Sequence, residues 1–179
     1  MKLLKSKNLQ LRALELEDVD VLYQWENDTG LWVVSNTTTP FSKYFLQQFI
    51  INSHNDIYTD KQLRLMIELV NNNTQPIGSI DLFDFDPKNL RAGIGILIAE
   101  KYRSKGYGSE ALDTVIEYCR KVLNMHQLYC NIGEDNPESL KLFQNKGFKI
   151  IGKKKHWIRK DDDWIDEYML QLVFEGGDE

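Results

Sequence analysis

The most informative stretch of this 179-residue sequence is Arg103-Ser104-Lys105-Gly106-Tyr107-Gly108-Ser109-Glu110-Ala111-Leu112. It follows an almost wholly apolar run, 92–99, and it opens a segment with helical apolar spacing that continues to about residue 123. Two glycines at a helix start let an anion approach the backbone, where unpaired N–H groups and the helix dipole attract it. Arg103 and Lys105 add positive charge. The stretch therefore predicts a phosphate-binding loop, although a helix start with a glycine hinge and two solvated cations would use the same residues.

Three kinds of phosphate-binding loop can be compared with this stretch. A Walker A loop requires Gly-x-x-x-x-Gly-Lys-Ser/Thr, which is absent. A dinucleotide-binding fingerprint would be Gly106-x-Gly108-x-x-Ala111, but the tight turn after the strand and the acidic residue about 20 positions further on are both missing. The third pattern is Arg-x-x-Gly-x-Gly, and Arg103, Gly106 and Gly108 match it.

The rest of the chain has the pattern of a mixed sheet with helices packed on it. Strand-like runs occupy residues 9–14, 63–70, 77–85, 92–99, 128–132, 148–158 and 164–174. Helices are predicted at 17–25, from Ser42 onward, at 106–123 and from 136 to 147. The helix after Ser42 is expected to carry Phe45, Phe49 and Ile50 on one face. Residues 26–41 are rich in Asn, Thr, Asp and Gly and are predicted to be a loop.

Two motifs about 30 residues apart make the chain resemble the GNAT superfamily of acetyl-CoA-dependent N-acetyltransferases, most closely its RimJ/RimL-type and spermidine N-acetyltransferase branches. One is the loop 103–108. The other is 136–143, Asn-Pro-Glu-Ser-Leu-Lys-Leu-Phe, followed by Gly147-Phe148, which is similar to the family's Asn-x-x-Ala-x-x-Leu-Tyr-x-x-x-Gly-Phe. The resemblance implies an α/β (α+β) fold: a mixed, mostly antiparallel sheet of about seven strands, splayed between the fourth and fifth and flanked by about four helices. It implies one domain over residues 1–179.

The resemblance also implies where acetyl-CoA would bind. The residues expected at its pyrophosphate are Arg103, Ser104, Lys105, Gly106, Tyr107, Gly108 and Ser109. The pantetheine arm would pair with the backbone of Ile96, Leu97 and Ile98 like an added strand. The N–H of Ile98 would polarise the acetyl carbonyl. Asn136 would hold the pantetheine arm, although Asn before Pro137 is also an ordinary helix cap.

The catalytic pair of the family does not carry over. The tyrosine that serves as the acid corresponds to Phe143, and the usual acidic positions correspond to Gly93 and Asn131. Further carboxylates that could face the cleft are Glu68, Asp81 and Glu134. Alternative proton donors are Tyr107, Tyr118 and Tyr129, and a chain of water molecules could replace a named base.

Asp81 and Glu134 are the catalytic candidates, with Asp81 preferred as the base. Asp81 lies on the strand beside the cofactor strand, amid Phe83 and Phe85. Burial there would raise its pKa toward the working pH. The same pattern also fits an edge or surface carboxylate.

The composition of the chain indicates which kinds of partner and which cellular compartment to expect. The chain has 22 Lys plus Arg against 27 Asp plus Glu, a net charge of −5, which disfavours nucleic-acid binding as the main role. No apolar run approaches the length of a membrane span, and the start does not have the pattern of a signal peptide, so we expect a cytoplasmic protein. No metal site is expected, because Cys119, Cys130 and the histidines His54, His126 and His156 form no ligand pattern.

The leading hypothesis is an N-acetyltransferase that moves the acetyl group of acetyl-CoA to a primary amine by direct attack in a ternary complex. The acceptor would be a small amine, a polyamine or a protein N-terminus, and the chain could assemble as a homo-oligomer. In the spermidine branch an acidic residue follows the Arg-Ala of the cofactor strand, whereas here Arg91-Ala92 is followed by Gly93. A non-catalytic acyl-CoA-binding or sensing module is the alternative, and a nucleotide-binding oxidoreductase is a third hypothesis.

Overall fold

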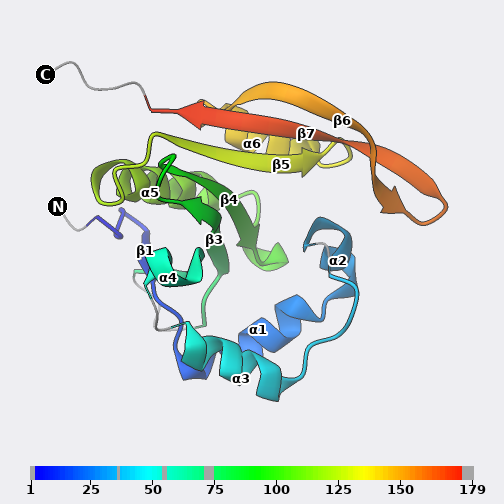
Figure 1. The fold of residues 1–179 in the computed structure, drawn as a ribbon. Coiled ribbons are helices and arrows are strands. Elements are labelled where there is room, and N and C mark those ends of the chain that lie inside the picture. The colour runs from blue at the N-terminus through cyan, green and yellow to red at the C-terminus, as the bar shows by residue number, and fades with distance from the viewer. Residues whose placement is uncertain (1–2, 36, 54–55, 71–74, 175–179) are drawn as a thin grey trace, which may run out of the picture.

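One seven-stranded sheet runs through the computed structural model, which describes residues 3–35, 37–53, 56–70 and 75–174. The strand order is β1-β2-β3-β4-β5-β7-β6 (Figure 1). The strands are β1 (Leu9–Arg12), β2 (Leu63–Leu69), β3 (Gly78–Asp86), β4 (Arg91–Ile98), β5 (Gln127–Gly133), β6 (Lys149–Lys160) and β7 (Asp163–Val173). Only the β4–β5 pair is parallel among these strands. The expected mixed, mostly antiparallel sheet is confirmed.

The described residues form more helices than the four expected. They are α1 (Val19–Glu26), α2 (Thr29–Ser35), α3 (Lys43–Asn52), α4 (Ile57–Asp60), α5 (Tyr107–Lys121) and α6 (Pro137–Gln144), with 3₁₀ turns at Leu16–Asp18 and Glu100–Tyr102. The prediction of a loop over 26–41 is wrong for α2. Two contacts support this short helix: Asp28 accepts from the N–H of Gly30, and the indole of Trp32 donates back to the carbonyl of Glu26. Both contacts join residues no more than six positions apart and use polar groups, which the spacing of apolar residues does not reveal.

Each face of the sheet has its own apolar core. Leu65 and Ile67 of β2 pack in a cluster with the buried side of α5, whereas Met66 between them packs with α1 and α3. Successive side chains of β2 therefore pack against two separate layers of helices, which lie apart in Figure 1. On α3 the buried residues are Leu46 and Ile50, and Phe45 is 53% exposed, so the prediction that Phe45 shares a face with Ile50 is wrong.

The sheet opens between β4 and β5. These strands pair only at Arg91–Gly93 with Gln127–Tyr129, and the rest of β4, residues 94–98, has no partner strand on that side among the described residues. This confirms the expected splay between the fourth and fifth strands. No helix among the described residues is long and apolar enough to cross a membrane.

Candidate active site

The unpaired edge of β4 presents backbone groups into the gap. The N–H of Ala99 donates to the carbonyl of Ile77 at 2.9 Å, so it points toward β3. Because N–H direction alternates along a strand, the N–H groups of Ile98 and Ile96 point to the open side. Leu97, which lies opposite Ser79 of β3, turns its backbone groups to β3 instead. Within the predicted cofactor strand, the backbone groups of Ile96 and Ile98 therefore face the gap, whereas those of Leu97 face β3.

The predicted phosphate loop leads into α5. Gly106 is the N-cap with a φ of 83°, a left-handed conformation that favours glycine. The N–H groups of Tyr107, Gly108 and Ser109 form the first helical turn and have no acceptor within the helix; the intrahelical ladder begins with Glu110 donating to Gly106 at 3.1 Å. A Cβ on Gly108 would lie 3.6 Å from Ile98 Cγ1. The loop and the open edge of β4 therefore adjoin.

The two cations of the loop have backbone partners. Arg103 Nε donates to the carbonyl of Ile98 at 2.9 Å, on the open side of β4. Lys105 Nζ donates to the carbonyl of Lys101 at 2.9 Å and lies over the Tyr102 ring. Arg103 thus joins the loop to the strand edge.

Asn136 is a helix cap in this structure. Its side chain accepts from the N–H of Ser139 at 3.1 Å, and Pro137 begins α6. The capping interpretation is confirmed, and contact with a pantetheine arm stays a prediction.

A cavity of about 270 Å³ lies in the gap of the sheet. Its apolar lining includes Trp25, Leu31, Phe83, Ile94, Ile132 and Phe143. Its charged lining is Glu26, Arg64 and Asp81, which form one ion-paired cluster. Arg64 Nε and Nη2 lie 2.6 and 3.2 Å from the two oxygens of Asp81, and Nη1 lies 2.5 Å from Glu26. Burial lowers the pKa of Arg64, but the two carboxylates outweigh it, so that pKa is raised and the guanidinium stays charged.

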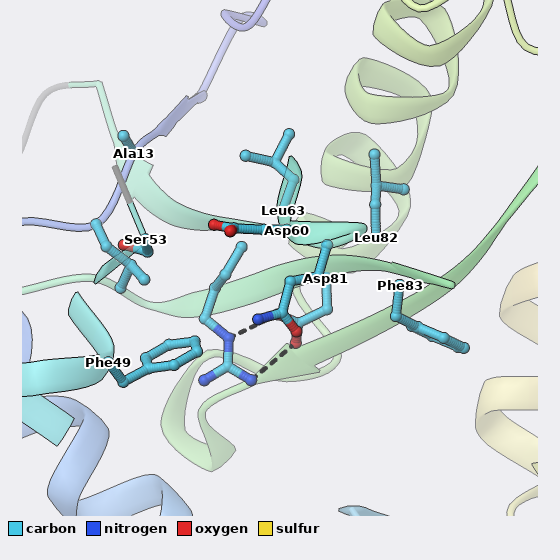
Figure 2. Close-up of a pocket in the computed structure, with 11 residues that line it drawn as sticks. Ala13, Phe49, Ser53, Asp60, Leu63, Asp81, Leu82 and Phe83 are labelled. Atoms are coloured by element: carbon cyan, nitrogen blue, oxygen red, sulfur yellow. Dashed lines mark hydrogen bonds and ion pairs between the residues drawn. The ribbon is translucent and has the colours of Figure 1, made fainter. Parts of the chain in front are cut away.

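A second cavity, of about 330 Å³, lies against the same ion pair (Figure 2). It shares Arg64, Asp81 and Phe83 with the first cavity. The dashed lines in Figure 2 mark the guanidinium hydrogen bonds to Asp81, and the ring of Phe49 lies beside that guanidinium, 5.6 Å from its carbon to the ring centre.

Asp81 lies in the cleft, but its setting differs from the apolar one that we expected. Its carboxylate is paired with Arg64, and one third of the side chain is exposed (33%). Phe83 lines the same cavity as Asp81. Phe85 instead packs in the core beside α5, because a bulge at Asp84, with a φ of 49°, shifts the register of β3.

Glu134 lies away from Asp81, immediately after β5. It accepts from Lys153 Nζ at 2.9 Å and from the N–H of Asp166 at 3.2 Å. The hydrogen bond from Lys153 is the largest cause that lowers the pKa of Glu134. A lowered pKa makes a weaker base, and Glu134 is not in the described lining of either cavity on Asp81. Glu68, the other carboxylate considered, pairs with Arg12 at 2.7 Å.

Position 143 holds a phenylalanine, and two possible proton donors near the cleft, Cys130 and Tyr129, have raised pKa values. Phe143 is buried and packs edge-on against Phe148, with ring centres 5.1 Å apart. Burial raises the pKa of the Cys130 thiol to about 12. Burial also raises the pKa of Tyr129 to about 12, and its hydroxyl donates to Asp84. A neutral phenylalanine therefore lines the cleft where the resembling family has a tyrosine.

The ring of Phe83 explains the glycine at position 93. A Cβ on Gly93 would lie 2.1 Å from Phe83 Cε2, and Phe83 packs edge-on against Tyr129 at the last β4–β5 pair. The ring thus occupies the space in which a side chain at position 93 would lie. Glycine at this position lets the aromatic ring pack directly against the backbone of β4.

We expect Gly93→Ala to lower the free energy of unfolding by about 1–3 kcal/mol, because the ring must move from a packed site. In a Phe83→Ala background the same change should cost at least about 1 kcal/mol less. Urea unfolding of the four proteins in this double-mutant cycle measures the coupling. An equal cost in both backgrounds would show that the ring is not the obstacle.

No sequence pattern predicted the ion-paired cluster or the contribution of α2. Arg64 is the only cation in the apolar run 63–70, which is a signal that could have marked it. Its partners Glu26 and Asp81 lie 38 and 17 residues away, and no local pattern links them. Among the described residues no group of three His, Cys, Asp or Glu side chains is placed to hold a metal, and His54 lies outside those residues.

Comparisons with known proteins agree with this geometry. Residues 8–149 match the family model described as an acetyltransferase (GNAT) domain. An uncharacterized N-acetyltransferase p20 of Bacillus licheniformis is 30% identical over 97% of both chains. A spermidine N(1)-acetyltransferase of Vibrio cholerae is 24% identical over 80% of both. A crystal structure of spermidine N-acetyltransferase from Vibrio cholerae with CoA and spermine superposes with a TM-score of 0.83 at 21% identity, covering 92% of this chain and 95% of that one.

The chain therefore belongs to the GNAT acetyltransferase family, and it is an acetyltransferase that uses acetyl-CoA.

Proposed function

We propose that this protein transfers the acetyl group of acetyl-CoA to a primary amine by direct attack in a ternary complex. The observation that carries the proposal is the meeting of two features at one place: the unpaired edge of β4 and the N-terminus of α5. One offers a strand edge for an extended amide-containing arm, and the other offers N–H groups for a diphosphate. Relatives named for spermidine make polyamines candidate acceptors beside other small amines and protein N-termini.

Acetyl-CoA would bind along this surface from its diphosphate to its thioester. The N–H groups of Gly106 to Ser109 would hold the diphosphate, supported by the charge of Lys105. Ile96 and Ile98 would pair with the amides of the pantetheine arm, since their backbone groups face the gap. Leu97 would contribute its side chain only, because its backbone groups face β3.

The reaction then needs a neutral amine close to the thioester carbon. The amine nitrogen forms a bond to that carbon, the carbon–sulfur bond breaks, the thiolate takes a proton, and the amine gives up one. An alkyl amine with a pKa of ~10.4 is about 3.4 units from being neutral at pH 7, which costs about 4.6 kcal/mol. The thiolate, with a pKa of ~8.5, has less need of a proton. A base therefore contributes more here than an acid, in keeping with a phenylalanine at 143.

We propose Asp81 as that base. It lies opposite Gly95, in the middle of the cofactor strand, and it lines the cleft. Its second oxygen has the longer contact with Arg64, 3.2 Å against 2.6 Å for the first, so it is the more available acceptor for a proton, directly or through water.

Two measurements test the proposal. Isothermal titration should show binding of acetyl-CoA, and a thiol assay across a panel of primary amines should show steady release of CoA above the rate without enzyme. Absence of acetyl-CoA binding would contradict the placement of the cofactor. Binding without thiol release on any amine would contradict transfer and favour a binding module.

A further inference from the structure

The charged side chains on the acceptor side of the cleft form ion pairs with one another. Glu26 and Asp81 bring two negative charges and Arg64 brings one positive charge, and the guanidinium contacts both carboxylates. The side chains of Arg64 and Glu26 are only about one fifth exposed (21% and 20%). Each carboxylate therefore already has a cationic partner, and only the second oxygen of Asp81, with its longer contact to Arg64, is available to the reacting amine. A mostly buried positive charge lies between the two carboxylates.

Large apolar side chains make up much of the wall around this cluster, with Ser53, Asp60 and Gln62 as polar members of the adjoining cavity. Trp25 of α1, Leu31 of α2 and Phe83 of β3 come from three elements and line the same cavity as the ion pairs. On the other side of the cluster, Phe49 packs over Arg64 and lines the adjoining cavity with Leu63 and Leu82 (Figure 2). Burial of an alkyl or aromatic group of the acceptor against these side chains is favourable. A second ammonium group would instead lose its hydration beside Arg64, which is unfavourable.

We infer, on the basis of the proposed function, that the acceptor is a monoamine with an apolar tail rather than a polyamine. The reacting amine needs one acidic neighbour, which Asp81 supplies. A polyamine needs further carboxylates free of other cations, and the described lining of the cleft has none. The ring of Phe83, which fills the space beside Gly93, adds apolar surface to this part of the site.

A matched pair of substrates tests this inference directly. n-Hexylamine and 1,5-diaminopentane have the same number of non-hydrogen atoms and differ in whether the far end is a methyl or an ammonium group. We expect kcat/KM per amino group to be at least tenfold higher for n-hexylamine. Equal values, or a preference for the diamine, overturn the inference; a preference for the diamine would point to Asp60 of the adjoining cavity as the partner of the second ammonium.

Two charge variants should move this ratio in opposite directions. Arg64→Gln leaves two unbalanced carboxylates and should shift the preference toward the diamine by about tenfold. Glu26→Gln removes one negative charge and should shift it toward n-hexylamine. Arg64→Lys keeps the charge and should leave the ratio close to that of the natural protein. Each ratio is measured within one preparation, so partial loss of folded protein cancels, and a ratio unchanged in both Gln variants counts against the inference.

The test separates this inference from the proposed function. Failure of the proposed function means that neither amine, nor any other amine, releases thiol. Failure of the inference alone means that thiol is released with the diamine at least as efficiently as with n-hexylamine.

Discussion

Gly108→Asp is expected to remove acetyl-CoA binding, with the affinity falling by at least about 100-fold. The new carboxylate would lie in the first turn of α5, next to the N–H groups that we assign to the diphosphate. Two like charges ~5 Å apart at an effective dielectric constant of ~20 repel each other by about 3 kcal/mol, which corresponds to about 100-fold in affinity. Isothermal titration with acetyl-CoA measures the loss.

Gly108→Ala is the matched control for this change. A Cβ at position 108 would meet Leu142 Cδ2 at 3.5 Å and Ile98 Cγ1 at 3.6 Å, which are ordinary van der Waals contacts. The alanine variant should therefore fold and bind acetyl-CoA within a few-fold of the natural protein. Thermal unfolding of both variants shows whether the fold is kept. If folded Gly108→Asp keeps its affinity, the diphosphate does not lie at this helix.

Asp81→Asn is expected to lower kcat at pH 7 by about 100-fold, the lower end of the range for loss of a general base. The affinity for acetyl-CoA should change little, because the loop of α5 and the open side of β4 are untouched. The loss should shrink as the pH rises toward ~10, since an amine that is already neutral needs no base. Steady-state rates from pH 7 to 10 with a primary amine measure this.

The pH dependence distinguishes a base from a purely structural partner of Arg64. If Asp81 only positions the guanidinium, the variant should be slower by a constant factor at every pH. Glu134→Gln, measured in the same way, compares the second candidate. We expect it to keep most of the rate, because Lys153 and the backbone of Asp166 hold that carboxylate beyond the end of β5. A larger loss in Glu134→Gln than in Asp81→Asn would reverse the assignment.

Local patterns predicted most of the fold. The alternation of strands, the cap at Ser42 and the glycine before α5 all appear where the sequence placed them. The departures occur where the spacing of apolar residues does not indicate which contacts form. Helix α2 forms in a segment without a clear apolar period, and Phe45 turns outward because Leu46 and Ile50 occupy the core side of α3.

The site divides in the same way. Its cofactor side could be predicted because the loop and the cofactor strand are neighbours in the sequence, and their helix-start and strand-edge geometry follows from local conformation. Even there, alternation of the backbone was needed to separate Leu97 from Ile96 and Ile98. The acceptor side could not be predicted, because its walls come from α1, α2, β2 and β3.

The amino-acid sequence by itself determined the strands, the helices other than α2 and α4, and the glycine-rich start of α5, because these depend on neighbouring residues. It also determined that position 143 is a phenylalanine where the family has a tyrosine, which depends on residue type alone. Only the tertiary structure decided that Asp81 faces a guanidinium rather than an apolar pocket. Arg64 meets Glu26 and Asp81 across 38 and 17 residues of chain, and it does so through pairing of β2 with β3 and packing of α1 against the sheet. The energy of such a cluster depends on three charges brought within hydrogen-bonding distance, and that distance exists only once the sheet has formed.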